Sequence, residues 1–187
     1  MDLLILDKDG TLVVPKSGKV FCDSPWDQKP IDGVQELLEG EYKLWRKIIV
    51  SNQGGVEAGH KTLENAILEM RFCLELFPQI EEAFFCPDFS GSVCYRVWGN
   101  CSEDCRIRYG VDELLASYLD RPDFTTKACF RKPDSGMLDL TINLFSPQRV
   151  TMIGDREEDR KAANFAGYPV DFFWASDKLL GGYDDKV

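Results

Sequence analysis

The sequence predicts an α/β fold in which a central parallel sheet carries helices on both faces. Three observations predict it: short apolar runs recur along the chain, segments with helical spacing lie between them, and polar clusters follow several runs. A short apolar run that ends in a turn signal is typical of a buried strand. Strands that alternate with helices form parallel sheets covered on both faces. The predicted strands are residues 2–6, 44–50, 82–86, 150–153 and 170–174.

Apolar residues at intervals of three or four positions predict amphipathic helices between these strands. Pro122 is a stop signal for one of them, and Gly167 is expected just after the end of a helix over residues 159–166. The apolar sets are Leu63, Ile67, Met70 and Leu74; Val111, Leu114, Leu115, Tyr118 and Leu119; and, more weakly, Ile31, Val34, Leu37 and Leu38.

One segment, residues 86–110, interrupts the alternation of strands and helices. It is rich in Cys, Gly, Ser and Asp, and we expect an irregular loop or small lobe there. A chain of 187 residues is long enough for one domain with its own core. The sequence therefore predicts a single domain over residues 1–187 with this one insertion.

The composition is that of a soluble globular protein, with 44% hydrophobic and 29% charged residues. No apolar run approaches the roughly 20 residues that span a bilayer, and the chain does not open with a basic segment followed by an apolar one. We expect a cytoplasmic protein without a membrane partner. The formal net charge of −10 disfavours general nucleic-acid binding, which relies on Lys and Arg, but it leaves room for a local basic groove.

The chain has seven cysteines and no secretory signal, which indicates reduced thiols. Four of them lie in the insertion, and four thiolates could form a structural zinc site. Their spacing is irregular and lacks a Cys-x-x-Cys pair, so ordinary reduced cysteines are the favoured interpretation. These residues are Cys86, Cys94, Cys101 and Cys105.

Two carboxylates, Asp7 and Asp9, directly follow the first predicted strand and precede Gly10 and Thr11. Open α/β sheets bind their ligands beyond the carboxyl ends of the strands. Residues two apart in an extended segment point the same way, so the two negative charges repel unless a cation lies between them. A hard divalent cation with oxygen ligands would resolve the conflict. The alternative is an ordinary acidic turn, since Asp and Gly are common turn residues.

Three further polar clusters follow along the chain. Because the strand ends of a parallel sheet converge on one edge, these clusters could share a single site. Together they supply carboxylates, a hydroxyl and a lysine, a set suited to phosphoryl transfer, in which positioning and charge neutralisation carry most of the catalysis. The clusters are Ser51-Asn52-Gln53-Gly54, Arg131-Lys132-Pro133 and Gly154-Asp155-Arg156-Glu157-Glu158-Asp159.

The four clusters, taken in this order, resemble the signatures of the haloacid dehalogenase (HAD) superfamily. The resemblance covers nearly the whole chain. The resemblance implies a Rossmann-like HAD fold and a phosphatase that works through an aspartyl-phosphate. Asp9 favours phosphate-ester hydrolysis, because the dehalogenase branch has no acid two residues after its nucleophile. Residues 13–30 and 56–81 are too short for the substantial cap domain of the mutase and ATPase branches, so we expect a capless or minimally capped site.

The resemblance also implies catalytic roles for four residues. Asp7 would be the nucleophile, and Asp9 would protonate the leaving alkoxide and then activate water. Ser51 would donate a hydrogen bond to the phosphoryl oxygens, with a turn or helix cap as the alternative. Lys132 would neutralise the phosphoryl group and the Asp7 carboxylate, with a solvated charge as the alternative.

Mg²⁺ is the cofactor that the resemblance implies. Its ligands would be the Asp7 carboxylate, the Asp9 backbone carbonyl and Asp155. Asp159 would be a second acidic partner that orients Lys132 or a metal-bound water. The alternative for Asp159 is an acidic first helical turn that favours the helix dipole.

Two clusters narrow the expected substrate. Ser51-Asn52-Gln53 and Arg131-Lys132-Pro133 resemble the group of histidinol phosphatases and heptose-bisphosphate phosphatases, and polynucleotide 3′-phosphatases belong to the same broad group. Asn52 and Gln53 are expected to contact a substrate hydroxyl, and Arg131 is expected to bind a second anion. We therefore expect a small phosphorylated metabolite such as a sugar phosphate.

Two alternatives stay open. Ser17-Gly18-Lys19-Val20-Phe21 resembles polynucleotide 3′-phosphatases, although the acidic charge opposes nucleic acid and Lys16 and Lys19 equally fit a solvated loop. A non-catalytic phosphate-binding module would be indicated by a missing catalytic carboxylate, and none is missing. The sole histidine, His60, is expected at the start of a helix over residues 61–75, without a catalytic role.

Overall fold

The computed structural model describes residues 1–101, 107–115 and 129–179. The strands are β1 (Leu3–Leu6), β2 (Val13–Val14), β3 (Lys29–Pro30), β4 (Arg46–Asn52), β5 (Glu82–Cys86), β6 (Val93–Cys101), β7 (Ile107–Leu115), β8 (Val150–Gly154) and β9 (Asp171–Trp174). The helices are α1 (Val34–Glu39), α2 (Leu63–Leu76), α3 (Gly136–Phe145), α4 (Glu157–Phe165) and α5 (Ala175–Leu179).

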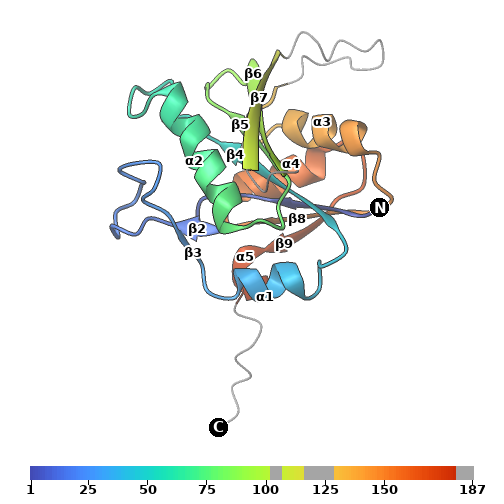
Figure 1. Cartoon of the computed structure of the whole chain (residues 1–187). Helices are drawn as coiled ribbons and strands as arrows, with labels where there is room; N and C mark the ends of the chain where they lie inside the picture. Colours follow the sequence, from blue (N-terminus) through green and yellow to red (C-terminus); the bar gives the residue numbers. More distant parts are fainter. Residues whose placement is uncertain (102–106, 116–128, 180–187) are drawn as a thin grey trace.

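A seven-stranded sheet forms the centre of the molecule, in the order β7-β6-β5-β4-β1-β8-β9. Strands β5, β4, β1, β8 and β9 are parallel to their neighbours in this part of the sheet. At the other edge, β6 pairs antiparallel with both β5 and β7. Figure 1 shows helices on both sides of this sheet. The predicted α/β fold is therefore confirmed, with the correction that one edge of the sheet is antiparallel.

Strand β1 lies in the middle of the sheet and is buried on both faces. Its alternate residues point to opposite sides. Leu4 and Leu6 belong to a core that they share with residues of α1, α2 and α5. Leu3 and Ile5 belong to a second core, shared with α3 and α4. Burial on both faces explains why this strand is an unbroken apolar run rather than an alternating one.

The segment predicted as an irregular loop contains a β-hairpin. Strands β6 and β7 pair from Val93 opposite Leu115 to Cys101 opposite Ile107, and β6 also pairs with β5. The helix expected from Val111, Leu114 and Leu115 is wrong, because these residues lie in β7. Residues two apart, such as Tyr109 and Val111, are also apolar and favour strands. The backbone of β6 then supplies the hydrogen-bonding partner that decides between the two patterns. Tyr118, Leu119 and Pro122 lie outside the described residues.

Three predicted helices are confirmed as α1, α2 and α4. Helix α2 begins after Thr62, whose side chain accepts a hydrogen bond from the backbone N–H of Asn65 at 3.1 Å. Gly167 follows α4 directly after the cap residue Ala166, as expected. Its φ is not positive, so this helix ends without the left-handed glycine that the sequence suggested.

The connections beside the predicted site are short. Between β2 and β3 the chain forms a compact loop in which the Asp27 carboxylate accepts hydrogen bonds from Ser17 N–H, Ser17 Oγ–H and Asp23 N–H. Between β4 and α2 it makes only turns. Neither of these two connections forms a further domain, and the prediction of a capless or minimally capped site stays a prediction because residues 102–106 and 116–128 lie outside the described ranges.

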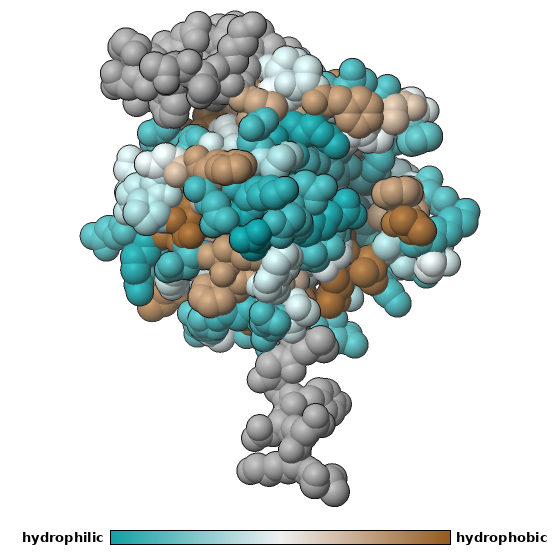
Figure 2. Space-filling view, turned by 180° about the vertical axis from the view of Figure 1, so that it is seen from behind, coloured by the Kyte–Doolittle hydropathy of each residue, from teal (hydrophilic) through white to brown (hydrophobic). Residues whose placement is uncertain are grey.

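The surface is mixed. Figure 2 shows that hydrophobic residues on the back face form separate small patches among hydrophilic ones. Scattered exposed apolar residues are normal on a globular protein. None of the helices in the described ranges has the length and hydropathy needed to cross a membrane.

Replacing Phe84 with Ala should destabilise the protein by roughly 3–5 kcal/mol, because the substitution empties a fully packed site. Phe84 is completely buried in β5, and its ring packs edge-on against the ring of Phe145, with 6.4 Å between the two ring centres. Urea unfolding measures the change. The control is Phe165→Ala at an exposed position, which should change the stability by less than about 0.5 kcal/mol. Equal effects of the two substitutions would contradict this assignment of the core.

Candidate active site

The four polar clusters meet at the carboxyl edge of the parallel sheet. Asp7 directly follows β1, Ser51 lies near the end of β4, and Asp155 directly follows β8. Lys132 comes from the segment before α3 and reaches the same place, since its Nζ donates to Asp7 Oδ1. The convergence predicted from the strand ends is therefore present in the structure.

Lys132 lies at the centre of this group. Its buried Nζ donates to Asp7 Oδ1 at 2.6 Å and to the Val50 carbonyl at 2.9 Å, and it lies 2.6 Å from Asp159 Oδ1. Burial alone would lower the pKa of Lys132, but Asp7 and Asp159 outweigh it and raise that pKa. Lys132 is thus a fixed positive charge and not a solvated surface lysine.

Asn52 holds the backbone of Lys132. Its Nδ2 donates to the Lys132 carbonyl at 2.8 Å, and its Oδ1 accepts from the Lys132 N–H at 3.0 Å. Both polar groups of the amide are therefore engaged with the protein. This geometry indicates that Asn52 positions Lys132, and the substrate contact expected for Asn52 stays a prediction.

Three carboxylates stand close together beside Lys132. Oxygen atoms of Asp7, Asp155 and Asp159 all lie within 4.8 Å of one another. Two glycines permit this crowding. A Cβ on Gly10 would lie 2.3 Å from Asp155 Oδ2, and a Cβ on Gly154 would lie 2.5 Å from Asp159 Cβ. Any larger residue at either position would push the carboxylates apart.

Burial makes the ionised forms of two of these carboxyl groups costly. Burial raises the pKa of Asp7, and Lys132 only partly opposes this effect. Burial also raises the pKa of Asp155. Carboxylate oxygens are the ligands that Mg²⁺ prefers, and a cation would remove the cost of ionising both groups. The residues present therefore fit a hard divalent cation.

Asp159 is less suited than its neighbours to bind a cation directly. Its Oδ1 pairs with Lys132, and its Oδ2 accepts the backbone N–H of Arg156 at the start of α4 at 3.1 Å. Both oxygens already have partners. Of the two roles expected for Asp159, the geometry favours orienting Lys132 and capping α4.

Asp9 stands on the other side of the site. Its Oδ1 accepts from Lys8 Nζ at 2.6 Å and its Oδ2 accepts from Gln53 Nε2 at 2.9 Å. Burial would raise the pKa of this carboxyl, but Lys8 and the hydrogen bonds outweigh it and lower that pKa. Gln53 Nε2 also donates to Ser51 Oγ at 2.9 Å. Gln53 therefore links two predicted catalytic side chains instead of facing a substrate alone.

Arg131 keeps a free donor. Its guanidinium carbon lies 5.0 Å from the centre of the Phe89 ring, and its Nη1 has no hydrogen-bond partner. The same guanidinium packs on Gly54, where a Cβ would lie 2.8 Å from Nη1. Nη1 is a buried donor without a partner, and the expected contact of Arg131 with a second anion stays a prediction.

The other basic side chains considered for substrate binding are already engaged or distant from the cluster. Lys19 pairs with Asp23 at 2.6 Å. Lys16 lies 5.1 Å above the centre of the Phe72 ring. His60 is exposed and lies three residues before the first residue of α2, Leu63.

The proposed four-cysteine zinc site is not supported. Among the described residues, the group of acidic, Cys and His ligands that could hold a metal consists of Asp7, Asp155 and Asp159. Cys94 and Cys101 lie in the same strand, β6, seven positions apart. That separation along the strand spans about 23 Å, which is too far for both residues to bind one ion. Cys105 lies outside the described residues.

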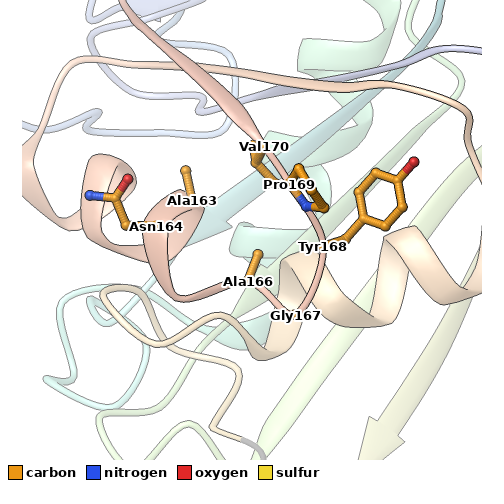
Figure 3. A pocket seen from close by; sticks show the side chains of 7 residues that line it. All are labelled: Ala163, Asn164, Ala166, Gly167, Tyr168, Pro169 and Val170. Carbon is orange, nitrogen blue, oxygen red and sulfur yellow. The ribbon is translucent and has the colours of Figure 1, made fainter.

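A separate shallow pocket lies away from this site. It is lined by residues 163–164 and 166–170, at the end of α4 and before β9 (Figure 3). Asp155 and Asp159 lie at the opposite end of that helix. Tyr168 is the one ionisable residue in the lining, so the pocket lacks the charges that a phosphoryl group needs.

Comparisons with known proteins agree with this geometry. Residues 129–170 match the family model described as HAD-hydrolase-like. The D,D-heptose 1,7-bisphosphate phosphatase from B. bronchiseptica, solved with magnesium and phosphate, is 20% identical at a TM-score of 0.59, over 99% of this chain and 89% of that chain. A candidate HAD-like phosphatase from Mesorhizobium loti is 20% identical at a TM-score of 0.58, over 89% of this chain and 69% of that chain. No curated protein matched. The predicted HAD-type fold is confirmed.

Mg²⁺ should raise the melting temperature of the protein, and more at about pH 8 than at about pH 5.5. The raised pKa values of Asp7 and Asp155 mean that protons compete with the cation as the pH falls. Thermal unfolding with and without MgCl₂ measures the shift. Asp155→Asn should abolish most of it, whereas Glu158→Gln, at an exposed position of α4, should retain it. A shift of equal size at both pH values, or one retained in Asp155→Asn, would contradict the site.

Proposed function

We propose that this chain, which has the fold of the HAD-type phosphatases, is a Mg²⁺-dependent phosphomonoester hydrolase that works through an aspartyl-phosphate. One observation carries the proposal. The Asp7 carboxylate has one oxygen on the buried Lys132 and stands in a three-carboxylate group with Asp155. A nucleophile placed between a fixed cation and a cation site is the arrangement that phosphoryl transfer requires.

The proposed reaction has two steps. In the first, Asp7 Oδ2 attacks phosphorus while the bond from phosphorus to the ester oxygen breaks, and Asp9 gives a proton to the leaving alkoxide. In the second, water attacks the same phosphorus, Asp9 takes its proton, and the Asp7 carboxylate is released. Lys132 holds Asp7 Oδ1, which leaves Oδ2 directed to the attack.

Charge neutralisation comes from both sides of the phosphoryl group. Lys132 supplies a fixed positive charge, and Ser51 Oγ, near the end of β4, supplies a hydroxyl donor. When bound, Mg²⁺ adds a Lewis acid that stabilises the charge developing on the phosphoryl oxygens. Its ligands would be the Asp7 carboxylate, Asp155 and the Asp9 backbone carbonyl.

Asp9 must carry a proton when the first step begins. In the free protein Lys8 lowers the pKa of Asp9 and keeps it ionised. A phosphate dianion placed beside Asp9 raises that pKa again, because a like charge disfavours the ionised form. Substrate binding and protonation of Asp9 are therefore linked, and the ionised form suits the second step.

The proposed substrate is a small phosphorylated metabolite such as a sugar phosphate. Arg131 has a guanidinium nitrogen, Nη1, without a hydrogen-bond partner, which supports a substrate with a second anionic group. The alternative of a nucleic-acid 3′-phosphate is less supported, because Lys19 is paired and Lys16 lies over an aromatic ring. A non-catalytic phosphate-binding module is also less supported, because every catalytic side chain of the resemblance is present and assembled.

Asp7→Asn should abolish phosphate release from p-nitrophenyl phosphate with Mg²⁺, a loss of at least about 10³-fold, because the amide cannot act as the nucleophile. Circular dichroism should show a retained fold. Asp171→Asn, at an exposed position of β9, is the matched control and should keep full activity. Activity retained in Asp7→Asn would exclude the covalent mechanism.

Arg131→Ala should raise the KM for a sugar bisphosphate by roughly 10-fold to 100-fold, the cost of losing a charge-assisted hydrogen bond. The KM for the corresponding monophosphate should change by less than about 3-fold, since the second anion is absent. Arg131→Lys keeps the positive charge but loses the paired N–H donors of the guanidinium, so its KM for the bisphosphate should lie between those of the wild type and Arg131→Ala. A preference for a 3′-phosphorylated oligonucleotide in the same panel, unaffected by these variants, would favour the nucleic-acid alternative.

A further inference from the structure

Five side chains form a closed ring around the carboxyl group of Asp9. They come from the two clusters after β1 and β4, from the loop before α2, and from α2 itself. Starting and ending at Asp9, the ring runs through Lys8, Glu69, Lys61 and Gln53. Lys8 and Glu69 are both buried, and neither has a part in the reaction proposed above.

The ring holds each oxygen of Asp9 by a separate arm. On one arm, Lys8 Nζ donates to Asp9 Oδ1 at 2.6 Å and lies 3.6 Å from Glu69 Oε2. On the other arm, Lys61 Nζ donates to Glu69 Oε1 at 2.7 Å and to Gln53 Oε1 at 3.1 Å. Gln53 Nε2 closes the ring by donating to Asp9 Oδ2 at 2.9 Å. Glu69 is the member of the ring that contacts both lysines.

A further side chain, Gln28, connects Lys8 and Glu69. Gln28, in the loop before β3, accepts from Lys8 Nζ at 3.4 Å and donates to the backbone carbonyl of Glu69 at 3.1 Å. Gln28 is fully buried. Helix α2 and the loop between β2 and β3 are therefore both tied to the side chain that precedes Asp9.

The ring is balanced in charge. Two carboxylates, Asp9 and Glu69, face two ammonium groups, Lys8 and Lys61. The side chain of Lys8 is 0% exposed and that of Glu69 is 2% exposed. Because an unpaired buried charge is costly, Glu69 stabilises the present positions of both lysines, the buried Lys8 and the partly exposed Lys61.

We propose that Glu69 is a positioning residue, which holds Lys8 and Lys61 from α2 and through them fixes the carboxyl group of Asp9 at the leaving oxygen. The inference rests on the proposed function, in which Asp9 protonates the leaving alkoxide. Glu69 itself does not touch the substrate. A displacement of a reacting group by about 1 Å can cost on the order of 10²-fold in rate.

The leaving group separates positioning of Asp9 from a general structural role. An alkoxide is a poor leaving group and needs the proton that Asp9 gives, whereas p-nitrophenolate leaves without one. In the first step a misplaced Asp9 therefore slows cleavage of an alkyl phosphate much more than cleavage of p-nitrophenyl phosphate. The second step, in which Asp9 activates water, is common to both esters, so the comparison uses kcat/KM, which reports on the first step. A loosened fold would lower kcat/KM for both esters alike.

The first experiment compares Glu69→Gln with the wild-type protein, using glycerol phosphate and p-nitrophenyl phosphate with Mg²⁺. The kcat/KM for glycerol phosphate should fall roughly 10-fold to 100-fold. The kcat/KM for p-nitrophenyl phosphate should change by less than about 3-fold. The matched control is Glu75→Gln, at an exposed position of the same helix, which should leave every parameter unchanged.

The second experiment uses the double variant Lys61→Met/Glu69→Gln, which removes one charge of each sign. It leaves Lys8 and Asp9 as a balanced pair, so its melting temperature should return towards that of the wild type even where Glu69→Gln folds poorly. Its kcat/KM for glycerol phosphate should stay low, because Gln53 has lost the Lys61 donor. Stability and catalysis then separate in one protein.

Several results would overturn the inference. Equal losses of kcat/KM for the two esters in Glu69→Gln, recovery of the glycerol phosphate kcat/KM in the double variant, or failure of the double variant to fold would each contradict it. Hydrolysis of neither ester by the wild-type protein is a different result. It would remove the proposed function itself, and the role of Glu69 with it.

Discussion

The structure depends on one buried group of charges, in which Lys132 lies between Asp7 and Asp159. Removing one partner from a buried ion pair costs about 3–5 kcal/mol, because the remaining charge is left without compensation. The group also ties together segments that are far apart in the sequence. It joins the end of β1, the segment before α3 and the start of α4, and Lys132 reaches β4 through the Val50 carbonyl. These contacts hold the ends of β1 and β4, the segment before α3 and the start of α4 together at the carboxyl edge of the sheet.

The carboxyl groups of the site fall into two groups whose pKa values are shifted in opposite directions. On the side of Asp7 and Asp155, burial raises the pKa of both carboxyl groups, which prepares them to take up a cation. On the side of Asp9, a neighbouring lysine lowers the pKa and two donors hold the carboxylate. These environments suit different roles. Asp7 is a nucleophile stabilised by a cation, whereas Asp9 is an acid that gains its proton only beside the substrate. The two environments keep two chemically identical side chains apart in function.

The sequence predicted the fold class and the meeting of the four clusters, because strand ends in a parallel sheet share an edge. It did not predict the partners of those clusters. Glu69 lies on a helix, where an isolated charge is usually solvated, and only the packing of α2 shows that it is buried. Asn52 follows a strand like a substrate contact, yet its amide holds the Lys132 backbone. Strand β7 was predicted as a helix because its apolar residues fit both periods, and pairing with β6 decides between them.

The central claim is that Asp7 becomes covalently phosphorylated, and trapping that intermediate tests it most directly. A single turnover of p-nitrophenyl phosphate with Mg²⁺ is quenched in acid and treated with borohydride, which reduces an acyl phosphate to the alcohol. Peptide mass spectrometry then locates the product. The account predicts homoserine in place of Asp7 in the peptide that begins at Met1. Reduction at another carboxylate, or at none while phosphate is released, would contradict it.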